Sequence, residues 1–136
     1  MDINKLKAQL TIDEGRKKRI YLDTKGKVTG GVGRNLTDRD FSDDEINLML
    51  ENDINLVITQ LDNLFPWWKY MSDARMVVLA NMCFNLGITK LGQFKNTLKA
   101  MQEGRYNDAA DAMLASAWAS QVGERAQRLS KLMREG

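Results

Sequence analysis

Ile12-Asp13-Glu14-Gly15 begins the most informative stretch of the chain, which continues with Ile20-Tyr21-Leu22-Asp23-Thr24 and Val28-Thr29-Gly30-Gly31-Val32-Gly33. Gly15 follows an amphipathic pattern, at a position where glycine commonly ends a helix. Residues 17–22 and 27–32 have the composition of two short strands. Between them, Asp23-Thr24-Lys25-Gly26 has Asp at the first and Gly at the fourth position of a type I turn. The stretch therefore predicts a helix followed by a β-hairpin.

Two carboxyl groups and a hydroxyl group occupy defined points of this predicted structure. Glu14 ends the helix, Asp23 lies in the turn, and Thr29 lies on the return strand. The negative end of the helix dipole favours a protonated carboxyl, which suits Glu14 as a general acid. Asp23 and Thr29 can hold a water between them, and such an arrangement is suited to glycoside hydrolysis. Each residue alone also has a plain structural interpretation, as a surface glutamate, a turn former and a strand former.

The remaining residues predict helices. Asp2 is a candidate N-cap for the first helix, whose Ile3, Leu6 and Leu10 are expected to form a buried stripe. Ser42-Asp43-Asp44-Glu45 is a capping box for a long helix that Pro66 ends. Ser72 caps an apolar helix ending at Gly87, and further helical segments are predicted at 93–103, 107–115 and 121–134.

These elements predict an α+β fold that is mostly helical. We expect one domain over residues 1–136, built from an N-terminal lobe (1–41) with a β-hairpin, a connecting helix (42–65) and an all-helical C-terminal lobe (66–136). An apolar content of 43% with a single proline is typical of a folded chain rather than a disordered one.

Several classes of function are excluded by composition. The chain has no histidine, which excludes Ser-His-Asp and Cys-His catalysis and, with the single Cys83, argues against a zinc site. We therefore expect no metal and no cofactor, and Cys83 is interpreted as a small core residue. No apolar run is long enough for a membrane span, and the N-terminus lacks the apolar region of a signal peptide. These features predict a protein that folds in a cytoplasm.

Charge is unevenly distributed and leaves one alternative function open. The net charge is +2, and the run Arg16-Lys17-Lys18-Arg19 makes the N-terminal part basic. A small basic protein could use this run, with Trp67, Trp68 and Tyr70, to bind nucleic acid without catalysis. A net charge of +2 is weak support for a nucleic-acid-binding protein.

This N-terminal stretch resembles the catalytic region of the phage-type lysozymes, the endolysin muramidases, through Glu-x8-Asp-x5-Thr in its helix, hairpin and glycine-rich context. Ala80-Asn81-Met82-Cys83-Phe84-Asn85-Leu86-Gly87, Phe94-Lys95-Asn96-Thr97-Leu98 and the pattern Trp118-x2-Gln121-x3-Arg125-x2-Arg128 extend the resemblance over nearly the whole chain. It implies a lysozyme-like fold.

The resemblance also implies roles for individual residues. Glu14 corresponds to the proton donor, and Asp23 and Thr29 correspond to the pair that holds the attacking water. The implied substrate-binding residues are Gly33, Phe84, Asn96, Thr97, Gln121 and Arg125. The family would bring Arg125 near Glu14. One departure is Arg34, which stands where the family commonly has a histidine that makes an ion pair, so the charge here does not titrate near neutrality.

The function implied by the resemblance is hydrolysis of the β-1,4 bond between N-acetylmuramic acid and N-acetylglucosamine in peptidoglycan, with inversion, for host cell lysis. The implied partners are peptidoglycan glycan strands and no nucleic acid. We expect a monomer without a stable membrane anchor, which gathers in the host bacterial cytoplasm. It would reach the cell wall after a separate holin-like protein has permeabilised the membrane.

Overall fold

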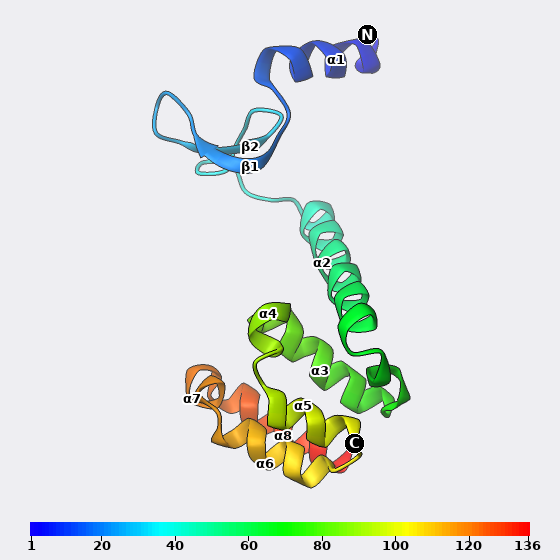
Figure 1. The fold of residues 1–136 in the computed structure, drawn as a ribbon. Coiled ribbons are helices and arrows are strands. Elements are labelled where there is room, and N and C mark those ends of the chain that lie inside the picture. The colour runs from blue at the N-terminus through cyan, green and yellow to red at the C-terminus, as the bar shows by residue number, and fades with distance from the viewer. The chain divides into compact units, whose positions relative to one another are not determined.

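The computed structural model describes residues 1–136 and confirms an α+β architecture that is mostly helical (Figure 1). It contains a three-stranded antiparallel sheet and eight α-helices. The chain divides into two compact units, an N-terminal unit of Met1–Ile46 and a C-terminal unit of Asn47–Gly136. No helix combines the length and the apolar character that crossing a membrane requires.

The N-terminal unit begins with α1 (Ile3–Glu14), followed by β1 (Lys17–Leu22), β2 (Val28–Gly31) and β3 (Arg34–Asn35). The Asp2 side chain accepts a hydrogen bond from the Lys5 amide at 3.2 Å, which confirms the predicted N-cap. The strand order is β1-β2-β3, and Thr29 in the central strand lies opposite Tyr21 and Asn35. The hairpin of β1 and β2 was expected, whereas β3 was not.

The prediction that Ile3, Leu6 and Leu10 form a buried stripe is wrong. Their exposed fractions are 59%, 38% and 42%, and no residue of α1 is buried. The buried residues of the N-terminal unit are Thr29 and Gly30. A unit of this size cannot enclose an apolar core of its own, so the amphipathic pattern of α1 is not matched by burial.

Helix α2 (Asp43–Leu64) starts at the predicted capping box. The Ser42 amide donates to Glu45 Oε1 at 2.8 Å, and the Glu45 amide donates to Ser42 Oγ at 3.2 Å. Pro66 follows the helix as expected and begins the 3₁₀ helix η1 (Pro66–Tyr70). The buried Trp68 indole donates to the Asp62 carboxylate at 2.8 Å, which fixes η1 against the end of α2 and lowers the pKa of Asp62.

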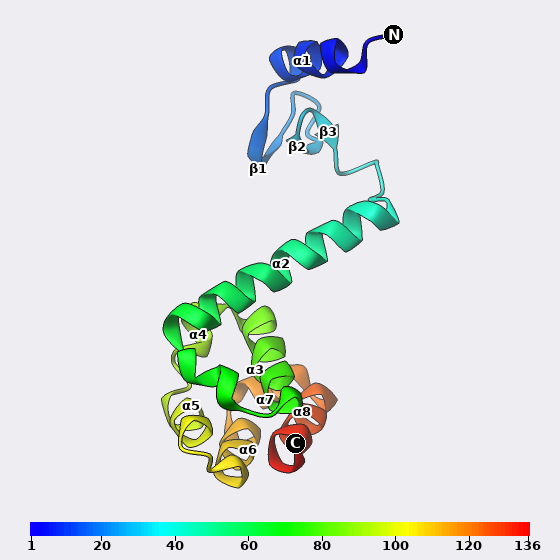
Figure 2. The ribbon, with the colours of Figure 1, turned by 90° about the vertical axis from the view of Figure 1, so that its right-hand side faces the viewer.

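The rest of the C-terminal unit is helical, as predicted (Figure 2). Its helices are α3 (Asp73–Leu86), α4 (Ile88–Leu91), α5 (Lys95–Gln102), α6 (Tyr106–Ala115), α7 (Ala117–Val122) and α8 (Glu124–Glu135). The short helices α4 and α7 were not expected. Ser116 caps α7 by accepting from the Ala119 amide at 3.3 Å, and Gly123 ends it. Ser116 and Gly123 are residue types that commonly begin and end helices. The prediction of a single helical segment at 121–134 did not take them into account.

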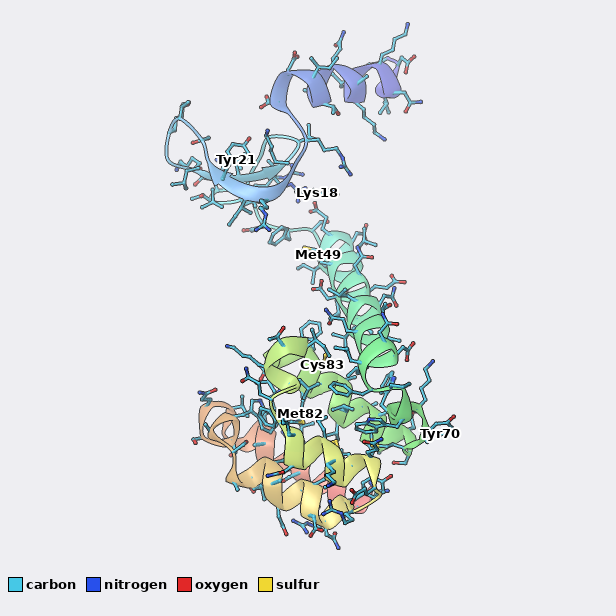
Figure 3. All side chains as sticks on the ribbon, in the orientation of Figure 1. Lys18, Tyr21, Met49, Tyr70, Met82 and Cys83 are labelled. Atoms are coloured by element: carbon cyan, nitrogen blue, oxygen red, sulfur yellow. The ribbon has the colours of Figure 1, made fainter.

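The apolar core lies in the C-terminal unit, where α3, α5, α6 and α8 pack together. Met82 and Cys83 lie within it on α3 (Figure 3). Cys83 is therefore the core residue expected from the sequence, and burial raises the pKa of its thiol. The largest fully buried side chains are Leu61, Leu79, Met82, Leu91, Met101, Met113, Met133, Val78 and Cys83.

Candidate active site

Glu14 is the last residue of α1, and its carboxyl group lies against Gly33. The helix ends here because Gly15 has φ +77°, and the Gly15 amide donates to the Thr11 carbonyl at 3.0 Å. A Cβ atom at position 33 would lie 2.6 Å from Glu14 Oε2 and 2.9 Å from Glu14 Cβ. The structure therefore brings two of the predicted site residues together, and the absence of a side chain at Gly33 is what permits the contact.

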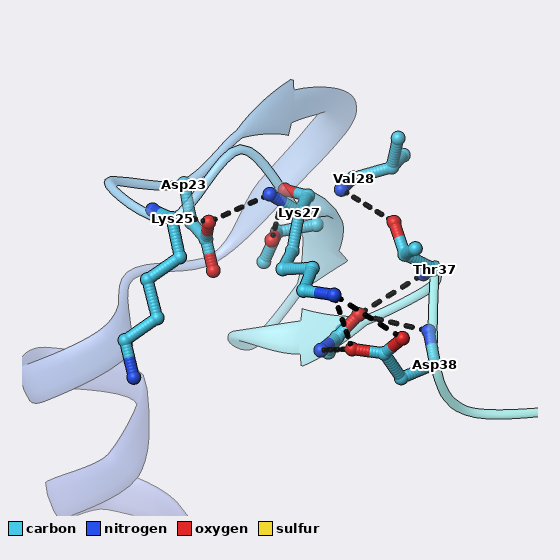
Figure 4. Close-up of polar contacts among 8 residues, drawn as sticks. Asp23, Lys25, Lys27, Val28, Thr37 and Asp38 are labelled. Carbon is cyan, nitrogen blue, oxygen red and sulfur yellow. Dashed lines mark hydrogen bonds and ion pairs between the residues drawn. The ribbon is translucent and has the colours of Figure 1, made fainter.

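Asp23 is held by the hairpin turn that was predicted for it. The Gly26 amide donates to the Asp23 carbonyl at 3.0 Å, and Gly26 has φ +76°. A type I turn followed by a left-handed glycine is a common three-residue hairpin loop. Asp23 Oδ1 accepts hydrogen bonds from the amides of Lys25 and Lys27, both at 2.8 Å (Figure 4). Oδ2 accepts no hydrogen bond from the protein, so it remains available to a ligand.

Thr29 is connected to Asp23 through the peptide groups of Lys27. The Thr29 hydroxyl donates to the Lys27 carbonyl at 3.0 Å, and the Asp23 amide donates to the same carbonyl at 2.9 Å. The Lys27 amide in turn donates to the Asp23 side chain. Thr29 is 4% exposed, in the middle of the sheet. Because its hydroxyl proton is engaged, the Thr29 oxygen can only accept further hydrogen bonds.

A second set of polar contacts fixes the segment after β2. The Val28 amide donates to Thr37 Oγ1 at 2.8 Å, and Asn35 Nδ2 donates to Asp38 at 2.8 Å (Figure 4). The Asn35 hydrogen bond, aided by Lys27, lowers the pKa of Asp38. These residues were not predicted from the sequence. The signal that could have found them is Asn35, whose side chain accepts from the amides of Thr37 and Asp38 in a local turn.

Arg34, the departure from the family pattern, forms an ion pair with Glu45 in the first turn of α2. The pKa of Glu45 is lowered to about 2, first by the hydrogen bond from the Ser42 amide and then by Arg34. Arginine side chains are protonated throughout the physiological pH range, so this ion pair does not depend on titration of its cation.

The predicted substrate-binding residues of the C-terminal unit lie in two hollows. Asn96, Thr97 and Gln121 line the first, here called the α5–α7 hollow, which has a volume of about 620 Å³. Lys90 and Lys95 line it too and were not singled out from the sequence. Trp118 forms part of its wall, is otherwise buried, and donates its indole N–H to Asn85 Oδ1 at 2.9 Å.

Phe84 and Arg125 line the other hollow, of about 390 Å³, with apolar residues of α2 and α3. Phe84 is 45% exposed rather than a core residue. Arg125 donates from Nε and Nη2 to Asn81 Oδ1, at 3.0 and 2.7 Å. The sequence alone did not indicate this pairing, because 44 residues separate the two positions.

Comparison with known proteins agrees with the resemblance in the sequence. The family model described as phage lysozyme matches residues 11–135. The chain is similar to "Probable T4-type lysozyme 2" of Dictyostelium discoideum, at 26% identity over 98% of this chain and 96% of that protein. "Probable T4-type lysozyme 1" of the same organism is 24% identical over the same shares. The "Pre-baseplate central spike protein Gp5" of Enterobacteria phage T4 is 26% identical over 91% of this chain and 26% of that protein.

Proposed function

Since the chain belongs to the phage lysozyme family and is a lysozyme-type glycosidase, we propose that it hydrolyses the β-1,4 bond between N-acetylmuramic acid and N-acetylglucosamine in peptidoglycan. The observation that carries this proposal is the joint attachment of Asp23 and Thr29 to the Lys27 peptide groups, with Glu14 set separately at the end of α1. In this proposal Glu14 is the proton donor, and Asp23 and Thr29 supply two oxygen acceptors.

The two acceptors are suited to orienting one water molecule. Asp23 Oδ2 accepts no hydrogen bond from the protein, and the Thr29 hydroxyl already donates its hydrogen to the Lys27 carbonyl. A water that donates one hydrogen to each of these oxygens directs its lone pair away from both. Attack by this water on the anomeric carbon, as Glu14 protonates the leaving oxygen, breaks the glycosidic bond with inversion.

The biological role proposed for this reaction is endolysin activity. The partners are peptidoglycan glycan strands, and the protein acts as a monomer on the cell wall of its bacterial host. Before lysis it gathers in the host cytoplasm and depends on a separate holin-like protein that permeabilises the membrane. Production of the protein in the cytoplasm of bacterial cells, followed by permeabilisation of the membrane in one half of the culture, tests this role, because lysis only of the permeabilised cells is expected.

The first test of the reaction compares wild type with Glu14→Gln on purified peptidoglycan. Wild type is expected to clear the suspension, whereas Glu14→Gln, which lacks the acidic proton, should lose activity by a factor of at least about 100. Circular dichroism should show both proteins folded, with the thermal midpoint of the variant unchanged or raised. Clearing by both proteins would show that Glu14 is not the acid, and clearing by neither would contradict the proposed substrate.

The reaction products distinguish hydrolysis with inversion from transglycosylation and from hydrolysis with retention. Hydrolysis creates a new reducing end, which transglycosylation on the same bond does not. Inversion predicts that the first product observed by NMR carries the α anomer, before mutarotation. A β anomer as first product would show retention, and the water-holding role of Asp23 and Thr29 would then be wrong.

A further inference from the structure

A third hollow on the C-terminal unit combines aromatic and basic side chains, and is here called the aromatic hollow. Its volume is about 570 Å³. It lies along α5 and the segment around η1. The residues that line it are Phe65, Trp67, Gly92, Lys95, Leu98, Lys99, Gln102 and Glu103. None of them belongs to the predicted catalytic or substrate-binding residues.

Phe65 and Trp67 form the apolar wall of the aromatic hollow. Their ring centroids are 6.0 Å apart, with the rings tilted by 51°. Both side chains are half-buried, whereas Trp68 and Trp118 are buried. Trp67 is therefore the one tryptophan whose ring is partly open to solvent. An aromatic face edged by polar groups matches a sugar ring, which has an apolar C–H face and a rim of hydroxyl groups.

The polar side of the aromatic hollow is basic. Glu103 is the one acidic residue in its lining, and Arg105 Nε binds it at 2.8 Å. Lys99 approaches Glu103 only at 4.0 Å and keeps 70% of its side chain exposed. Lys95 forms no ion pair and occupies the first turn of α5, where the helix dipole adds positive potential. An anionic group is therefore favoured beside Lys95.

Lys95 connects the aromatic hollow to the α5–α7 hollow, because it lines both. The α5–α7 hollow contains Asn96, Thr97 and Gln121, which the family resemblance assigns to substrate binding. A polymeric ligand that occupies the α5–α7 hollow can therefore continue past Lys95 into the aromatic hollow. This continuity favours a glycan strand over an unrelated ligand.

We propose that the aromatic hollow is an additional saccharide subsite for the peptidoglycan strand. A sugar ring stacks on Trp67, Gln102 binds its hydroxyl groups, and Lys95 binds a carboxylate of the peptide branch that the strand carries. The inference rests on the proposed function for the identity of the ligand. It adds a place where the strand is held on the C-terminal unit without taking part in bond cleavage.

Co-sedimentation with insoluble peptidoglycan tests the subsite in the Glu14→Gln background, in which the strand is not cut. Trp67→Ala is expected to weaken binding about tenfold, as for an aromatic anchor. The matched control is Tyr70→Ala, since Tyr70 is an aromatic residue of the same η1 that is 91% exposed and points out of the unit (Figure 3). Tyr70→Ala should bind as the parent does. Equal binding by both variants would overturn the proposal.

Two changes test the role of Lys95: removal of its charge, and removal of the peptide branches from the ligand. Lys95→Ala should weaken binding about threefold at low salt, and the loss should shrink as salt is added. Lys69→Ala removes the same charge from a 60% exposed side chain outside the hollow and is expected to have no effect. With glycan strands stripped of their peptide branches, Lys95→Ala should also have no effect. An undiminished loss there would contradict the carboxylate contact.

Fluorescence keeps the test valid if Trp67→Ala fails to fold. Soluble chitotetraose should change the emission of the Glu14→Gln protein, and most of this change should disappear in Trp67→Phe, which retains an aromatic ring for packing. A change that persists in full would overturn the stacking on Trp67.

Clearing assays on the same variants with Glu14 intact separate the two proposals. Absence of clearing by wild type contradicts the hydrolase, whereas unaltered binding by Trp67→Ala contradicts the subsite.

Discussion

At the scale of single residues, Asp23 has a structural role in the turn, and the proposed function gives it a chemical role; two substitutions separate the two. Asp23 Oδ1 accepts from the Lys25 and Lys27 amides, while Oδ2 is free. An asparagine keeps an acceptor for both amides but loses the negative charge. We expect Asp23→Asn to unfold at nearly the wild-type temperature and to clear peptidoglycan at least about 100-fold more slowly. Asp23→Ala should lose activity and also about 1–2 kcal/mol of unfolding free energy, because two turn amides lose their acceptor.

Chemical denaturation and clearing rates measure the two effects independently. Activity near the wild-type level in Asp23→Asn would show that Asp23 only shapes the turn. A stability loss in Asp23→Asn as large as that in Asp23→Ala would show that the turn requires the charge itself.

Gly33 and Gly31 form a matched pair that tests the contact with Glu14. They have nearly the same positive φ, +62° and +61°. A Cβ atom at Gly31 would meet no atom within 4 Å, whereas one at Gly33 would meet the Glu14 side chain at 2.6–2.9 Å. Each alanine substitution should therefore cost about 1 kcal/mol of backbone strain. Gly33→Ala should in addition slow clearing at least about tenfold, since Glu14 must shift and misplacement of a catalytic group is costly.

The two variants are compared by thermal unfolding and by clearing rate. Similar activity in Gly33→Ala and Gly31→Ala would show that the position of Glu14 does not depend on Gly33. The comparison controls for the strain of a positive φ, because the two residues have nearly the same φ.

At the scale of elements, the start of α2 determines how stability responds to acid. Ser42 and Arg34 stabilise the Glu45 carboxylate and lower its pKa from 4.5 to about 2. A lowered pKa in the folded state means that this contribution is complete above about pH 4.5 and disappears as the pH falls towards 2. Because the partner of Glu45 is an arginine and not a histidine, no loss of this ion pair is expected near neutral pH.

Glu45→Gln tests this pH dependence, because glutamine still serves in a capping box but cannot pair with Arg34. The thermal midpoint of the variant should lie below that of wild type at pH 7, and the difference should vanish as the pH is lowered to 2. Glu51→Gln, on the same helix and in no ion pair, should behave as wild type throughout. A difference that stays constant from pH 7 to pH 2 would contradict the assigned ion pair.

The elements that the sequence predicted well are those determined by nearby residues. The capping box of Ser42 and Glu45, the turn from Asp23 to Gly26, and the caps at Asp2 and Ser72 all form between residues two to four positions apart. The features that the sequence did not reveal depend on distant residues. Arg125 donates hydrogen bonds to Asn81, which lies 44 positions earlier in the chain. The apolar residues of α1 are not buried, because their own unit has no apolar core.

The same distinction applies to the candidate site. Local signals predicted the hairpin that carries Asp23 and Thr29, but their connection through the Lys27 peptide groups is seen only in the folded structure. Lys95 offered no local signal, because only folding brings α5 beside Phe65 and Trp67. Packing brings together the residues that we propose bind the glycan strand, and a single sequence does not show that packing.

At the scale of the whole molecule, apolar burial is concentrated in one unit. The buried apolar residues extend from Val57 to Met133, all in the C-terminal unit, and the N-terminal unit buries Thr29 and Gly30. Since apolar burial dominates folding free energy, the C-terminal unit carries most of the stability. The unit that holds Glu14, Asp23 and Thr29 is held instead by turn, cap and strand hydrogen bonds.

Hydrogen exchange should therefore divide the molecule into two levels of protection. Amides of α3 around Leu79 are expected to exchange only through global unfolding, whereas those of β1 and β2 exchange through local opening of the hairpin. Leu79→Ala, which opens a cavity at a fully buried site, should cost about 2–5 kcal/mol. It should speed exchange in α3 by the corresponding factor and leave the hairpin rates unchanged. If the hairpin amides accelerate as much as those of α3, the hairpin opens only when the core unfolds, and the order of the N-terminal unit depends on that core.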